Sequence, residues 1–168
     1  MSAASNFLEN ELLDHVLKFG NGSLTVGTGS GYAAPSVVYV ALFTALVGET
    51  GALATALESG TSAATATNWG YYEVTTSGTA YARQSITFSA AGLVTPGTIT
   101  SNATVTFPVA TADYNNAAAS GATVRSMALM DASTGGNVLF YGALTNSKTV
   151  NSGDQFTISS GNLTVSLA

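Results

Sequence analysis

A β-strand is predicted by the segment Tyr81-Ala82-Arg83-Gln84-Ser85-Ile86-Thr87-Phe88, whose side chains alternate between two faces. Ala82, Gln84, Ile86 and Phe88 share one face, and Arg83 shares the other with Tyr81, Ser85 and Thr87. Because the chain has only four Lys and Arg residues, an arginine in a strand predicts a carboxylate partner, for which Glu73 and Asp131 are the candidates. A bidentate bond to one of them would fix the strand register. A ligand-binding role for Arg83 is the alternative.

The same two-residue period continues on both sides of this segment. It predicts a mainly β fold, an antiparallel β-sandwich with a jelly-roll-like arrangement, because many short strands alternate with Gly, Ser, Asn and Pro turns. The alternation is clean near the end of the chain, in Phe156 and Ile158 and again in Leu163, Val165 and Leu167. The predicted strands are Leu24–Gly27, Val37–Thr44, Tyr71–Thr75, Tyr81–Ser89, Thr98–Thr100, Thr104–Val109, Val124–Asp131, Val138–Leu144, Thr149–Val150, Gln155–Ser159 and Leu163–Leu167.

One short α-helix is predicted at the N-terminus. Asn6 can cap it, Glu9 can answer the cap, and Gly20 ends it. At 100° per residue one face is apolar, and Leu13 and Leu17 flank it. We expect a helical arm over residues 1–20 and a single β domain over 21–168, with the arm docked either on that domain or on a neighbouring subunit. The apolar stripe, the predicted interface, consists of Leu8, Leu12, Val16 and Phe19.

Two segments are predicted to be long loops. Residues 48–68 are rich in Ala, Thr, Ser and Gly, and residues 113–121 contain Asn, Ala, Ser and Gly. Long loops on a rigid scaffold often bind ligands or partners. A spacer without a partner is the alternative for both.

The composition is poor in charge, and this excludes several classes of protein. Charged residues make up 8% of the 168 residues, against roughly a quarter in ordinary domains. Such a surface suits a protein that packs against many neighbours. The net charge is −5 and the basic residues are scattered, so we expect no nucleic-acid binding. No apolar run approaches the roughly 18 residues that span a bilayer, so we expect no membrane insertion.

No catalytic, cofactor or metal site is predicted, and we expect the chain not to be an enzyme. His15 is the one histidine, and it stands in the predicted helix without a nucleophile motif. There is no cysteine. The acids near strands include Glu73, Asp131 and Asp154, but nothing pairs any two of them in the geometry that glycoside hydrolysis needs. Asp113, Asn115 and Asn116 lack the spacing of a calcium loop.

Three segments together resemble a family of small phage virion proteins, commonly labelled tail-fibre-like or capsid-decoration proteins. They are Phe7 to Leu17, the strand Tyr81 to Phe88, and Asp131 to Leu144; Ser152 to Phe156 fits as well. The likeness runs from about residue 6 to the end. It implies a β-sandwich and a place on the virion surface.

The leading hypothesis is a capsid decoration, or cement, protein that binds and stabilises the outer shell. The compact chain lacks the repeats of a long fibre, and its charge-poor surface suits docking at repeated shell sites. The alternative is a short tail or head fibre that adheres to the host surface through exposed aromatic side chains. A lectin-like module or a carbohydrate-active enzyme is a third interpretation. The aromatic candidates for sugar stacking are Trp69, Tyr71, Tyr72 and Tyr114.

The expected partners are other virion components. They comprise copies of the chain itself, as a dimer or trimer, and the major capsid protein or another virion protein. In the fibre alternative a host surface glycan is added. We expect assembly in the host cytoplasm and a final place on the outer surface of the virion.

The helical arm leads to a prediction. A chain that starts at Asn21 should lose stability or aggregate if the helix packs on its own domain, since each buried leucine contributes about 1.5–3 kcal/mol. If the helix reaches a neighbour, the shortened chain should melt normally but fail to assemble. Thermal melting and sedimentation of both chains distinguish these outcomes, and a shortened chain that melts and assembles like the parent contradicts both.

Overall fold

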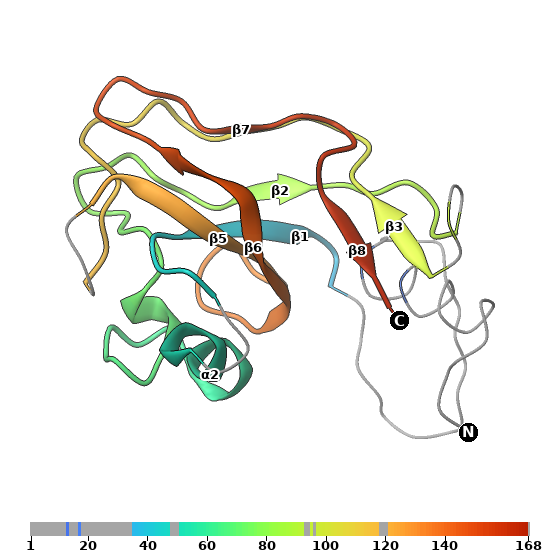
Figure 1. The fold of residues 1–168 in the computed structure, drawn as a ribbon, viewed down its shortest axis with the longest axis horizontal. Coiled ribbons are helices and arrows are strands. Elements are labelled where there is room, and N and C mark those ends of the chain that lie inside the picture. The colour runs from blue at the N-terminus through green and yellow to red at the C-terminus, as the bar shows by residue number, and fades with distance from the viewer. Residues whose placement is uncertain are drawn as a thin grey trace. The chain divides into compact units, whose positions relative to one another are not determined.

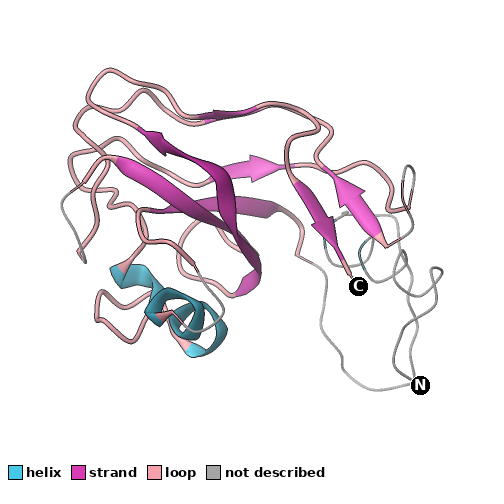
Figure 2. Cartoon of the chain, in the orientation of Figure 1, coloured by secondary structure: helices cyan, strands magenta, loops and turns pink. Residues whose placement is uncertain are grey.

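The computed structural model describes Leu13, Leu17 and residues 35–47, 51–92, 95, 97–117 and 121–167. As predicted, this part of the chain is mainly β with antiparallel strands, and long stretches between the strands are loops (Figure 2). The jelly-roll arrangement stays a prediction. The elements are β1 (Val38–Phe43), α2 (Ala52–Ser59), the 3₁₀ helix η1 (Trp69–Tyr71), β2 (Gln84–Ile86), β3 (Thr98–Thr100), β4 (Val105–Thr106), β5 (Thr123–Met130), β6 (Val138–Thr149), β7 (Thr157–Ile158) and β8 (Thr164–Ser166).

The described chain divides into two compact units. The larger contains residues 39–85 and 106–157, and the smaller contains residues 86–105 and 158–168 together with the chain up to residue 38. The larger unit is built on a four-stranded sheet in the order β2-β1-β5-β6 (Figure 1). β1 and β5 pair antiparallel from Tyr39 opposite Met130 to Phe43 opposite Ser126. Five of the six residues of β1 are buried, which makes it the central strand of the core.

One face of this sheet is covered by α2. Ala41 and Phe43 of β1 and Ala128 and Met130 of β5 point to the same face, because side chains alternate along a strand. They pack with the helix and with the first residue of η1 in one apolar cluster. The members from these two helices are Leu53, Ala56, Leu57 and Trp69.

The helix α2 corrects the prediction of a surface loop over residues 48–68. Its sequence, Ala52 to Ser59, is mostly Ala, Leu and Thr, and the loop interpretation followed the small polar residues around it. However, Leu53, Ala56 and Leu57 have the i, i+3, i+4 spacing of a helix face, and Ala and Leu are strong helix formers. Burial against the sheet therefore decides the structure of this segment.

Residues 61–70, the next part of the predicted loop, are held together by hydrogen bonds within the segment. The side-chain oxygen of Asn68 accepts hydrogen bonds from the backbone N–H and the hydroxyl of Thr61, at 2.7 and 3.0 Å. Gly70 lies so close to this segment that a Cβ atom there would stand 2.1 Å from the carbonyl oxygen of Ser62. Residues 61–70 therefore form a compact loop that leads into η1.

An aromatic group packs elsewhere in the larger unit. The Tyr81 ring stacks on Phe107 at a centroid distance of 6.0 Å and meets the Tyr114 ring edge to face at a centroid distance of 5.8 Å. Phe107 in turn meets Phe156 edge to face. Tyr81 is tied to the sheet because the backbone N–H of Leu42 donates to its hydroxyl, at 3.0 Å.

The smaller unit contains β3 and β8, which pair antiparallel with Ile99 opposite Val165. Leu163 and Val165 are buried while Thr164 and Ser166 are exposed, as the alternation near the C-terminus predicted. Ile86, Phe88 and Ile99 are also buried in this unit.

The segment Tyr81 to Phe88 departs from the predicted single alternation. Tyr81 and Arg83 are buried, and so are Ile86 and Phe88, whereas Ser85 and Thr87 are exposed. The alternation therefore changes phase inside the segment. The physical reason is that residues 81–83 precede the paired strand Gln84–Ile86, so Tyr81 and Arg83 can turn inward, where both bind Glu73.

Of the predicted N-terminal helix, the structure describes Leu13 and Leu17, which are helical and buried within this chain. The predicted stripe of Leu8, Leu12, Val16 and Phe19 lies outside the described residues, as do His15 and the predicted strand Leu24–Gly27. The predicted strand Tyr71–Thr75 is wrong. In its place η1 ends at Tyr71, and Glu73 makes an isolated bridge to Phe43.

Candidate functional site

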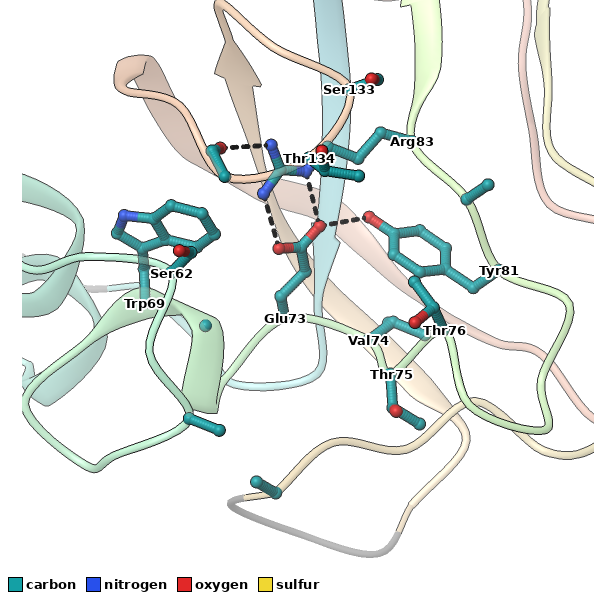
Figure 3. Close-up of a pocket in the computed structure, with 15 residues that line it drawn as sticks. Ser62, Trp69, Glu73, Val74, Thr75, Thr76, Tyr81, Arg83, Ser133 and Thr134 are labelled. Atoms are coloured by element: carbon teal, nitrogen blue, oxygen red, sulfur yellow. Dashed lines mark hydrogen bonds and ion pairs between the residues drawn. The ribbon is translucent and has the colours of Figure 1, made fainter.

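Arg83 is a buried residue of the larger unit and binds four acceptors. Its Nε and Nη2 atoms donate to the two carboxylate oxygens of Glu73, at 2.7 and 2.8 Å, in a bidentate ion pair (Figure 3). Its Nη1 atom donates to the carbonyl oxygens of Ala132 and Gly135, at 2.9 and 2.8 Å. The two side chains are 4% and 13% exposed, so water does little to weaken the pair.

The charges and their surroundings determine the protonation of Arg83. Burial acts to lower the pKa of the guanidinium, but the hydrogen bonds that it donates to Glu73 and the negative charge of that carboxylate more than compensate, so the pKa of Arg83 is raised. The cation is therefore permanent.

Tyr81 links the Arg83–Glu73 ion pair to strand β1 of the sheet. Its hydroxyl donates to Oε1 of Glu73 at 2.9 Å and accepts from the backbone N–H of Leu42. Burial raises the pKa of Tyr81 well above its ordinary value, and the negative charge of Glu73 raises it further. The phenol thus stays protonated and keeps its role as a donor to the carboxylate.

Trp69 forms one wall beside the guanidinium, whose Cζ atom lies 5.0 Å from the centre of the indole ring. Stacking of this kind adds attraction between cation and ring. Trp69 is 1% exposed and Tyr114 is fully buried, so the prediction that these two are exposed for sugar stacking is wrong. Both belong to the core. Tyr71 and Tyr72 are half-buried and contact each other edge to face.

The carbonyl groups that Arg83 binds belong to the loop between β5 and β6. Asp131 closes this loop: its two carboxylate oxygens accept from the backbone N–H and the side-chain amide of Asn137, both at 2.7 Å. Gly136 has a φ of 74°, and a Cβ atom there would meet the Asp131 carboxylate at 2.3 Å. Of the two candidate partners of Arg83, Glu73 binds it directly, and Asp131 instead shapes the loop that Arg83 holds.

A cleft of ≈ 380 Å³ opens over the ion pair. Three segments line it: the loop after α2, the chain from Glu73 to Arg83, and the β5–β6 loop. Ala117 is one further residue of the lining. Figure 3 shows hydroxyl side chains from all three of these segments around the ion pair. These hydroxyl-bearing residues are Ser62, Thr75, Thr76, Ser133 and Thr134.

The charged side chains of the cleft are already paired with each other. Glu73 is the one carboxylate among the residues that line the cleft, and both of its oxygens bind Arg83. Within the described residues, no group of three or more His, Cys, Asp or Glu side chains is arranged to hold a metal ion. None of the described helices is long and apolar enough to cross a membrane.

The sequence narrowed the partner of Arg83 to Glu73 or Asp131, but it did not predict the polar rim around the pair. Ser62, Ser133 and Thr134 are ordinary loop residues of a chain rich in Ser and Thr, and no spacing distinguishes them. Their position depends on α2 and on the β5–β6 loop, which bring distant parts of the chain together.

Comparison with known families agrees with the resemblance in the sequence. The family model described as "Podophage GP4 fiber I protein gp80" matches residues 3–166. The chain belongs to this phage fibre protein family. It is therefore a structural protein of a phage virion, and the resemblance to fibre-like virion proteins is confirmed. No curated protein sequence matches the chain.

The ion pair leads to a prediction about stability. Arg83→Ala should lower the free energy of unfolding by about 3–5 kcal/mol, because Glu73 is left buried without its cation. Arg83→Lys should recover part of the loss, since an ammonium group cannot replace the planar fork. Chemical denaturation measures both. Arg125→Ala, at an exposed position on β5, is the matched control and should change stability by less than about 0.5 kcal/mol. An Arg83→Ala variant that unfolds like the parent contradicts the role of the pair.

Proposed function

We propose that the chain is a short fibre of the virion, carried on its outer surface, rather than a decoration protein of the capsid shell. The observation that carries the proposal is the family match, which covers residues 3–166 and whose description names a fibre protein. The absence of stalk-forming repeats was the sequence argument for decoration. That argument opposes a long fibre but is compatible with a short one.

The cleft adds support from the geometry. It presents loop side chains around a rigid, buried ion pair, and binding residues of fibres are expected on loops held by a firm scaffold. A decoration protein needs chiefly a surface that matches the shell. The cleft is therefore easier to explain in a protein that meets a ligand outside the particle.

We propose further that the fibre acts without catalysis. The carboxylate pair of a glycoside hydrolase needs two free acids on either side of a bond. Among the residues that line the cleft, Glu73 is the one acid, and it is bound to Arg83. This arrangement favours recognition without cleavage.

Copies of the chain itself and a second virion protein are the partners that we propose. A chain with 8% charged residues has few charged groups to keep neighbours apart. In the described sheet the twelve-residue strand β6 pairs with β5 alone, so its outer edge offers backbone groups to another chain. Both features favour self-association.

The location on the particle tests the fibre proposal. Antibodies raised against the chain should label purified virions at the tail or at discrete fibres. Quantitative mass spectrometry should find far fewer copies than of the major shell protein. Label spread evenly over the shell, with a copy number comparable to that of the shell protein, would contradict the fibre role and favour decoration.

A further inference from the structure

We propose that the cleft above Arg83 and Glu73 binds a neutral sugar unit, mainly through hydroxyl groups of Ser and Thr side chains. The proposal deepens the fibre function and rests on it for the source of the ligand, a host surface glycan. Three properties of the cleft support it: its charge balance, its free hydroxyl groups and its rigid rim.

The charge balance favours a neutral ligand. Glu73 and Arg83 are the charged side chains among the residues that line the cleft, and their bidentate bond cancels both charges. Four hydrogen bonds occupy most of the N–H donors of the guanidinium, so few donors remain to bind an anion. A phosphate or carboxylate ligand would have to displace Glu73 from a buried site, which is costly.

The free hydroxyl groups suit a ligand that both donates and accepts hydrogen bonds. Four exposed side chains line the cleft, and their hydroxyl groups have no hydrogen-bond partner within the described part of the chain. A hydroxyl group is a donor and an acceptor at once, and so is each hydroxyl of a sugar. The four residues are Ser62, Thr76, Ser133 and Thr134.

The rim is rigid, so binding requires little ordering of the protein. Asn68 ties the segment that carries Ser62, and Gly70 lets that segment pack closely. Arg83 and Asp131 hold the loop that carries Ser133 and Thr134 from two sides. A preformed site avoids much of the entropy lost on binding.

The size and the apolar surface agree with one sugar ring. The volume of ≈ 380 Å³ is at the lower end of the range of roughly 300–1,000 Å³ for small-molecule sites. Ala64 and Ala117, which are both exposed, add apolar surface for the C–H groups of a sugar. Trp69 is not a stacking platform, because it is buried and Arg83 covers its ring. Hydroxyl contacts without stacking predict weak binding by one chain, strengthened by many copies on a particle.

The test titrates ¹⁵N-labelled protein with neutral methyl glycosides of glucose, galactose, mannose, rhamnose and N-acetylglucosamine, followed by NMR. At least one should bind saturably and shift the amide signals of residues 62–64 and 133–135. Methyl glucuronide, which is negatively charged, should bind more weakly than its neutral counterpart. If no neutral glycoside binds, or if the shifted signals lie outside the cleft, the proposal is wrong.

Matched variants locate the binding. The double variant Ser133→Ala with Thr134→Val should weaken binding about tenfold, because two hydrogen bonds are lost while the shape is kept. Ser62→Ala, on another segment of the rim, should weaken it independently. Thr145→Val, at an exposed position of β6 outside the cleft, is the control and should bind like the parent. Equal affinity in the parent and in all rim variants overturns the proposal.

The two proposals can fail separately. If the protein is located on fibres but the glycosides do not bind, the sugar site alone is refuted. If a rim-dependent sugar site is found in a protein spread over the capsid shell, the fibre role alone is refuted.

Discussion

The bidentate bond between Arg83 and Glu73 is the constraint on which the larger unit depends. A guanidinium with 4% of its side chain exposed must satisfy its donors within the protein, and it does so with one carboxylate and two carbonyl groups. Through these acceptors it joins the chain after η1 to the β5–β6 loop. Tyr81 carries the connection to the backbone of β1. One cation therefore connects three segments that are distant in the sequence.

This arrangement explains how a chain with so few charges forms a rigid cleft. Asn68 and Asp131 add hydrogen bonds to backbone and side-chain groups of the rim, and glycines permit close approach where a side chain would clash. The charge of Arg83 is used inside the protein and not on its surface. The exposed polar groups above it are neutral hydroxyls.

The sequence predicted a good part of this and missed the rest for definable reasons. The β class followed from alternation that local residues control, as at Leu163 and Val165. The partner of Arg83 was narrowed to two acids because charges are rare in the chain. The helix α2 was missed because its small side chains resemble a loop until the sheet that buries them is present. The phase change at Arg83 was missed because it depends on Glu73, which no local pattern places there.

The predicted exposure of Trp69 failed for a related reason. Its burial depends on α2 and on the guanidinium above its ring, and neither contact is visible in the segment around it. The hydroxyl groups of the cleft could not be predicted for the same reason. Each is unremarkable in sequence, and its place depends on contacts made elsewhere: Asn68 ties the segment of Ser62, and Arg83 binds the loop of Ser133 and Thr134.

Residue-resolved hydrogen exchange of the Glu73→Gln variant tests this account most directly. If the bond between Glu73 and Arg83 joins β1 to the β5–β6 loop, the amides of Leu42 and Asn137 should both exchange faster than the global loss of stability explains. Amides of the smaller unit, such as Ser101, should follow the global change alone. If the Leu42 and Asn137 amides keep the protection that they have in the parent, the ion pair does not join β1 to the β5–β6 loop and the account is wrong.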